Sequence, residues 1–100
     1  MNEIQEIIYW SAKEATGIWD IISEISQKRN ISRNSAVDLF KNEIDFIKNN
    51  DEVFLLKSDK LYDNNTILNI DKNMILELDY SNFDFNENGI FYYLSDDVNV

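Results

Sequence analysis

The chain has 100 residues, 44% of them apolar, and carries a formal net charge of −10. It contains neither cysteine nor histidine, which excludes disulfides, thiolate nucleophiles, cysteine-ligated metal sites and every catalytic arrangement that needs an imidazole. A chain of this length and apolar content fits one domain with a core of ordinary size. We therefore expect a single domain over residues 1–100, with no cofactor and no enzymatic activity.

Residues 2–28 show the period of an amphipathic helix, because their apolar side chains recur at intervals of three and four. Gly17 lies inside this segment, where glycine costs about 1 kcal/mol relative to alanine. The segment is thus either one helix or two helices that meet near Thr16. Residues 28–30, Lys-Arg-Asn, are typical of a helix C-terminus.

A second helix is expected to start between Ser32 and Ser35. Ser35 is followed three residues later by Asp38, which approximates a capping box with Asp in place of Glu. Apolar residues then continue at helical spacing to Ile47, and the polar residues 49–51 end the helix.

After this stop the pattern changes to short β-type runs over Glu52–Leu56, Thr66–Ile70 and Met74–Tyr80. The last run is also rich in good helix formers, so a helix is the alternative there. Phe83–Phe85 and Ile90–Leu94 flank residues 86–89, whose Asn88-Gly89 pair supplies the positive φ angles of a tight hairpin turn.

These patterns predict an α+β fold, with N-terminal helices packed on a small antiparallel sheet that ends in a C-terminal hairpin. The helical part covers residues 2–49 and the strand-rich part residues 52–95.

The negative charge is concentrated in the second half of the chain. Residues 51–100 hold eleven carboxylates and three lysines, whereas residues 1–50 hold eight carboxylates and six basic residues. Six aromatic residues lie within Tyr80–Tyr93. Acidic side chains over an aromatic layer suit a basic protein partner. The expected contact residues are Asp59, Asp63, Glu77, Asp79, Asp84, Glu87, Asp96 and Asp97, with Tyr80, Tyr92 or Tyr93 as anchors.

Two further patterns have a simpler interpretation. Asp84, Asn86, Asn88 and Gly89 match the start of a calcium-binding loop, but position twelve is Ser95 instead of a bidentate Glu, so we interpret them as turn residues and expect no metal. The Asp96-Asp97 pair, or Asp79 with Asp84, could act in acid–base catalysis only at a fixed separation inside a cleft; we interpret these carboxylates as a solvated face.

Residues 19–47 resemble a helix–turn–helix, in which Lys28, Arg29, Arg33, Asn34 and Lys41 cluster near the turn between the two predicted helices. The second helix also carries acidic residues, and the net charge repels nucleic acid, so two packed helices are the preferred interpretation. Trp10 and Trp19 are both expected in the core, with an exposed interface anchor as the alternative for Trp10.

The N-terminus lacks the pattern of a secretory signal, and no window approaches the roughly 18 apolar residues of a membrane span. We expect a cytoplasmic protein that binds neither nucleic acid nor membranes.

The order of Gly17–Ile22, the helix start at Ser32–Phe40, the strand Glu52–Leu56 and the closing Gly89–Tyr93 resembles small bacterial immunity proteins of polymorphic toxin and contact-dependent growth inhibition systems. The resemblance implies a cytoplasmic antitoxin that binds and neutralises a cognate toxin domain, often a nuclease. It implies no residue roles. The alternative is an acidic nucleic-acid mimic from a mobile element, and a third reading is a subunit whose acidity only aids solubility.

Overall fold

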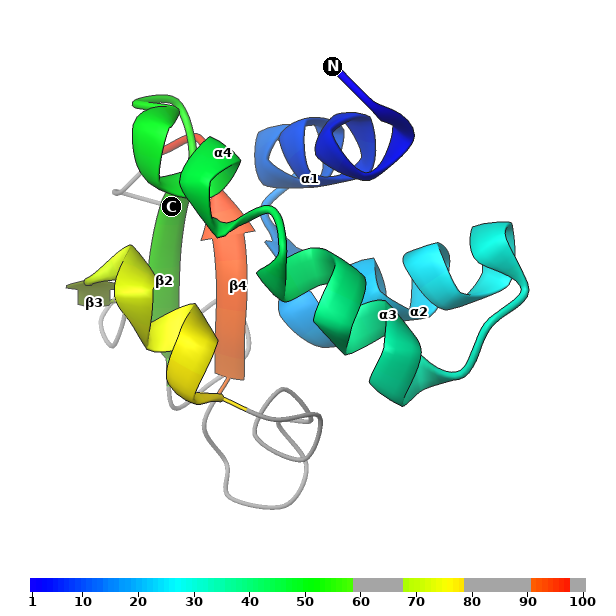
Figure 1. Ribbon diagram of the computed structural model, residues 1–100. Coiled ribbons are helices and arrows are strands. Elements are labelled where there is room, and N and C mark those ends of the chain that lie inside the picture. The colour runs from blue at the N-terminus through cyan, green and yellow to red at the C-terminus, as the bar shows by residue number, and fades with distance from the viewer. Residues whose placement is uncertain (59–67, 79–90, 98–100) are drawn as a thin grey trace.

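The computed structural model describes residues 1–58, 68–78 and 91–97. Its helices are α1 (Glu3–Lys13), α2 (Ile18–Arg29), α3 (Arg33–Lys41), α4 (Ile44–Asn49) and the 3₁₀ helix η2 (Lys72–Glu77). Its strands are β1 (Thr16–Gly17), β2 (Phe54–Ser58), β3 (Leu68–Ile70) and β4 (Phe91–Ser95). Figure 1 shows α1, α2 and α3 together on one side of the sheet, next to β4. The predicted α+β class is confirmed.

The N-terminal segment forms two helices, the second of the two alternatives that the sequence leaves open. A capping box starts α1: the Gln5 N–H donates to Asn2 Oδ1 at 2.8 Å, and the Asn2 N–H donates to Gln5 Oε1 at 3.1 Å. The helix ends before Ala15, which has a φ of 53°. The next two residues form β1, with Thr16 opposite Leu94 of β4. Because extended residues pair with β4 here, the helix cannot continue.

α2 ends as the sequence predicts, whereas α3 begins with a different N-cap from the predicted one. Asn30 is left-handed, with φ 52° and ψ 52°, as the Lys-Arg-Asn pattern predicts. The cap of α3 is Ser32, whose Oγ accepts a hydrogen bond from the Ser35 N–H at 3.1 Å. The predicted box starting at Ser35 is wrong, because Ser35 already lies in the first turn of α3.

Asn30 allows a test of this helix end. A non-glycine residue in the left-handed region costs about 1–2 kcal/mol, and asparagine tolerates that region better than alanine does. We expect Asn30→Ala to lower the free energy of unfolding by about 1 kcal/mol, and Asn30→Gly to leave it equal or higher. Urea unfolding of the two variants, which differ only at this exposed position, measures the difference in the free energy of unfolding. Equal stability of both variants would contradict the strain argument.

The predicted helix from Ser32 to Ile47 is interrupted, because α3 ends at Lys41 and α4 begins at Ile44. Glu43 lies at the break and binds α1 with both carboxylate oxygens. Oε1 accepts from Asn2 Nδ2 at 3.1 Å, and Oε2 accepts from Gln5 Nε2 at 2.8 Å. Contacts to a distant segment therefore accompany the bend, and the local pattern does not contain them.

The sheet has the strand order β1-β4-β2-β3, and all of its pairs are antiparallel. The predicted strand at residues 52–56 begins two residues later, at Phe54. In the β2–β4 pair, Leu55 lies opposite Leu94 and Leu56 lies opposite Tyr93. The first pair belongs to the core shared with the helices, and the second pair forms a separate buried cluster. β2 is buried on both faces, which explains its continuous apolar run.

The predicted strand at residues 74–80 is wrong over its described part, since Lys72–Glu77 form η2. The helical alternative agrees better with the observed 3₁₀ helix. Asp71 caps η2 by accepting from the Asn73 N–H at 2.9 Å. Lys72 Nζ donates to the carbonyl oxygens of Ile47 and Asn50, both at 2.9 Å. This ammonium group ties η2 to the C-terminal end of α4, where a positive charge is favourable.

Lys72 also has a consequence for the pH dependence of stability. Burial lowers the pKa of Lys72 below 10.5, and the Asp51 carboxylate offsets part of the effect. Between the folded pKa and 10.5 the unfolded chain therefore binds more protons, and the contribution of this group to the free energy of unfolding rises with pH. The wild type should gain stability relative to Lys72→Met between neutral pH and a pH of about 10 in urea titrations. Lys48→Met makes the same substitution at an exposed position of α4 and is the control.

Of the predicted C-terminal hairpin, only the second strand falls within the described residues. β4 covers Phe91–Ser95, within one residue of the predicted Ile90–Leu94, whereas the turn and the first strand lie outside the described residues. β4 pairs with β1 on one side and with β2 on the other. The last described strand thus occupies the interior of the described sheet.

One apolar cluster joins the two halves of the chain. Ile8 and Ile22 from the helices, Phe40 from α3, and Leu55 and Leu94 from the sheet all belong to it, and each is fully buried. The helical and strand-rich parts therefore share a core.

Candidate functional site

The structure describes five of the predicted contact residues. Glu77 is exposed on η2, and Asp96 and Asp97 are exposed after β4. Tyr92 is half-buried against the main core, with Lys57 Nζ 6.0 Å from its ring centroid. The other predicted contacts, Asp59, Asp63, Asp79, Tyr80, Asp84 and Glu87, lie outside the described residues, as do the calcium-like loop and the Asp79–Asp84 pair.

Tyr93 does not lie on the surface. Its side chain is fully buried, with Leu56 opposite on β2 and Gly17 opposite on β1. The expectation that Tyr93 anchors a partner therefore conflicts with its position. Successive side chains of a strand point to opposite faces of the sheet, so Tyr93 faces away from Leu94 and packs in a second cluster with Leu56, Ala15 and Phe54.

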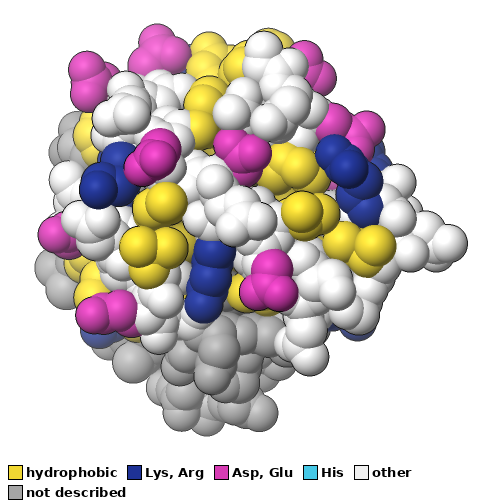
Figure 2. Space-filling view, in the orientation of Figure 1, with side chains coloured by type: hydrophobic (Ala, Val, Ile, Leu, Met, Phe, Trp, Pro, Cys, Tyr) yellow, Lys and Arg dark blue, Asp and Glu magenta, His cyan; other side chains and the backbone are white. Residues whose placement is uncertain are grey.

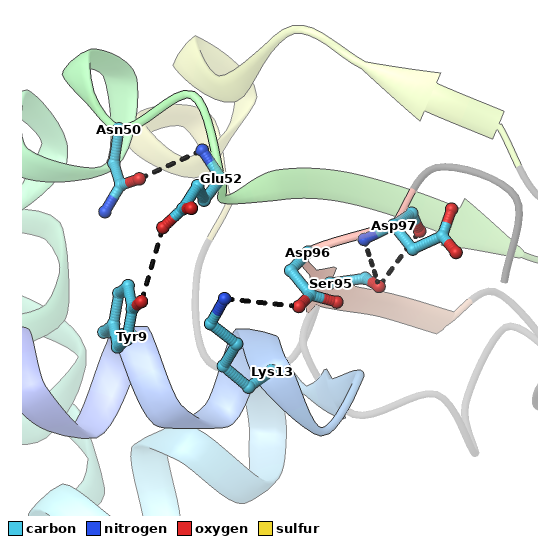
Figure 3. A network of polar contacts seen from close by, with 7 residues as sticks. All are labelled: Tyr9, Lys13, Asn50, Glu52, Ser95, Asp96 and Asp97. Atoms are coloured by element: carbon cyan, nitrogen blue, oxygen red, sulfur yellow. Dashed lines mark hydrogen bonds and ion pairs between the residues drawn. The ribbon is translucent and has the colours of Figure 1, made fainter.

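Asp96 and Asp97 belong to a junction of three segments (Figure 3). Asp96 Oδ2 lies 3.5 Å from Lys13 Nζ, and the Asp96 N–H donates to the Ala12 carbonyl at 2.9 Å. Ser95 Oγ accepts from the Asp97 N–H at 3.1 Å and donates to the Asp97 carbonyl at 3.0 Å. These contacts hold the chain after β4 against α1. Asp96 therefore has a structural role in addition to its place on the acidic surface.

The same junction extends to the turn before β2. Tyr9 donates its hydroxyl to Glu52 Oε2 at 3.3 Å, and Lys13 Nζ lies 5.1 Å from the centroid of the Tyr9 ring. Desolvation lowers the pKa of Lys13, but Glu52, Tyr9 and Asp96 more than offset this, so its pKa is raised above 10.5. Lys13 therefore remains charged and holds Asp96 near α1, whereas the Tyr9 hydroxyl contacts Glu52.

The basic side chains of the chain are mostly engaged within the molecule. Lys28 lies 3.5 Å from Glu24, Arg29 lies 2.8 Å from Glu3, and the Arg33 guanidinium lies 5.4 Å from the Trp19 ring centroid. These are three of the residues in the helix–turn–helix resemblance, and each contacts a neighbouring side chain of the chain itself. The helices α2 and α3 pack against each other, in agreement with the interpretation as two packed helices.

Many carboxylates, by contrast, are directed outward. Glu6, Glu14, Asp20, Asp38 and Asp45 are exposed, and within the described ranges none has a basic side chain within 4.0 Å. Figure 2 shows acidic side chains in several separate places over one face, with apolar and basic side chains between them. The acidic character of the described surface is thus spread over the helices as well as the C-terminal half.

Trp10 is the largest exposed aromatic side chain of the described part, with 62% of its surface accessible. The expected burial of Trp10 is wrong and its exposed alternative is correct, whereas Trp19 packs against the core. The Tyr9 ring meets the Trp10 ring edge-on, with 5.3 Å between centroids and 86° between planes. The signal in the sequence is the position of Trp10 off the apolar stripe of α1.

Trp10 lines a groove of about 340 Å³ between α1 and α2. The walls of the groove carry Glu6 from α1, Glu14 at the C-cap of α1, and Glu24 and Lys28 from α2; the buried Ile7 and Ser11 lie in the same lining. The acidic residues of α1 and Trp10 share a face because they follow helical spacing. An aromatic ring among carboxylates is suited to bind a cationic group.

Other classes of site find little support in the described ranges. No group of three or more Asp or Glu side chains is placed there to hold a metal ion. None of the described helices combines the length and the apolar character that a membrane crossing requires. Comparisons with protein-family models, with curated proteins and with solved structures yield no match.

Proposed function

We propose that this protein is an immunity protein that binds and neutralises a cognate toxin domain through an acidic and aromatic surface. The simplest such toxin is a nuclease with a basic cleft, and the encounter takes place in the cytoplasm. The protein performs no reaction in this role.

The observation that carries the proposal is a difference between the basic and the acidic side chains of the described residues. Lys13, Lys28, Arg29 and Lys72 make contacts within the chain, whereas Glu6, Glu14 and other carboxylates are directed to solvent. The surface therefore presents more negative than positive charge to a partner. Such a surface attracts a basic protein over long range and accelerates association, a useful property in an antidote.

Capture on the immobilised protein tests the proposal. An extract of the producing cells is passed over the protein at low and at moderate salt, and bound proteins are identified by mass spectrometry. We expect one basic partner in a stoichiometric amount, retained at moderate salt, whose toxic or nuclease activity is abolished by an equimolar amount of this protein. Several nucleic-acid-binding proteins that salt releases together would favour the mimic instead, and the lack of any specific partner would contradict both functions.

The captured partner allows a prediction about rate. Asp38→Asn, Asp45→Asn and Asp51→Asn together remove three exposed negative charges without removing an ion pair between described residues. We expect the association rate constant to fall about threefold to tenfold at low salt, because electrostatic steering weakens. Stopped-flow measurements at rising ionic strength should show the difference disappear. Asn49→Gln, an uncharged change on the same helix as Asp45, is the control; an unchanged rate in the triple variant would contradict steering.

A further inference from the structure

The groove between α1 and α2 can bind a cationic group more specifically than a general acidic surface can. At one end, Arg29 Nε lies 2.8 Å from Glu3 Oε1 and joins the C-terminus of α2 to the N-terminus of α1. On the α2 wall, Lys28 lies 3.5 Å from Glu24, one helical turn away. Both basic residues beside the groove therefore have an acidic partner already.

The α1 wall keeps its negative charge. Glu6 and Glu14 are exposed, and neither has a basic side chain within 4.0 Å among the described residues. Trp10 lies between them on the same helix and in the same groove. Carboxylates on both sides of an exposed indole provide hydrogen-bond acceptors and a π face for one cation.

No basic side chain of the described residues covers the exposed Trp10 ring. Lys13 lies over the neighbouring Tyr9 ring, and Arg33 lies over Trp19, whereas no described Lys or Arg lies over Trp10. The edge-on contact with Tyr9 holds the indole in place and leaves 62% of the residue accessible. A ring held in this way loses little conformational entropy when a partner contacts it.

We propose that this groove receives an arginine side chain of a basic protein partner, with the guanidinium stacked on Trp10 and paired with Glu6 or Glu14. Arginine fits better than lysine, because its planar guanidinium stacks on an aromatic ring and binds carboxylates with two parallel hydrogen bonds. The inference rests on the proposed function, since it names the surface and the side chain through which the toxin domain is bound.

An NMR titration tests the groove with a defined probe, a hexa-arginine peptide. The ¹⁵N-labelled full chain shows one indole N–H signal for each of Trp10 and Trp19, and Trp10→Phe assigns them. We expect the Trp10 signal to shift in a saturable manner while the Trp19 signal, from a residue packed on the core, remains in place. A shift confined to backbone signals near Asp96 and Glu52, with no change at Trp10, would overturn the inference.

Variants separate the groove from net charge. Glu6→Gln with Glu14→Gln, and Trp10→Ala alone, should each weaken binding of the peptide about twofold to fivefold. Asp38→Asn with Asp45→Asn removes the same charge as the double Glu variant, but at sites outside the groove. This variant should weaken binding of the peptide less. Hexa-lysine should bind more weakly than hexa-arginine. Equal losses in the two double variants, or equal affinity for the two peptides, would contradict the arginine site.

The failure of this inference is distinguishable from failure of the proposed function. If the capture experiment yields a neutralised toxin that Trp10→Ala still binds with unchanged affinity, the immunity function stands and the groove is not the contact. If capture yields no specific partner, the function fails, whereas the peptide titration still decides whether the groove binds arginine.

Discussion

Phe40→Ala is expected to lower the free energy of unfolding by about 3–5 kcal/mol, the range for removing a fully buried aromatic side chain. Phe40 is completely buried in the main core, and α3, which carries it, packs against α2. The loss combines the transfer free energy of the ring with the cost of the cavity that remains. Urea unfolding followed by far-UV circular dichroism measures it.

Two variants make this result interpretable. Phe46→Ala removes the same side chain from α4, where the ring is only half-buried, and should cost about 1 kcal/mol. Phe40→Leu keeps much of the volume and should remain folded even if Phe40→Ala does not, with a loss of about 1–2 kcal/mol. Equal losses at Phe40 and Phe46 would show that α3 does not pack on the core as described.

Leu94→Ala should lower the free energy of unfolding by about 2–5 kcal/mol. Leu94 is fully buried in β4, where it lies opposite Thr16 of β1 and Leu55 of β2, and it belongs to the core that the helices share. Its truncation therefore removes contacts to the sheet and to the helical half together. For a domain of this size, each kcal/mol corresponds to a decrease of about 4–8 °C in Tm.

Leu76→Ala is the matched control, since Leu76 lies on η2 with 50% of its surface exposed and should change stability by less than about 0.5 kcal/mol. The comparison also tests whether the chain unfolds as one unit. If it does, Leu94→Ala in a Trp10→Phe background shifts the transition reported by Trp19 fluorescence in α2 to the same extent as the transition reported by circular dichroism. Separate transitions would contradict the single shared core.

The candidate site was only partly evident in the sequence. The acidic character was evident from composition, and the predicted contacts Glu77, Asp96 and Asp97 are indeed exposed. Trp10 was expected in the core, with an exposed interface anchor only as the alternative, and the groove beside it was not predicted, because a helical pattern shows that a residue lies off the apolar stripe but not whether another segment covers it. Tyr93 was misplaced for the converse reason, since an aromatic run does not show which side chains from distant segments pack on each face of the strand.

The sequence by itself determined the helical spacing of residues 2–47, the left-handed end of α2 at Asn30, the approximate position of β4 and the excess of negative charge. Those features depend on side chains a few residues apart, or on none at all. Only the tertiary structure decided the break before α2, where β1 pairs with β4; the break before α4, where Glu43 binds α1; and the position of η2, where Lys72 binds the end of α4. Each of these depends on a partner distant in the sequence, and local periodicity contains no information about which distant segment packs where.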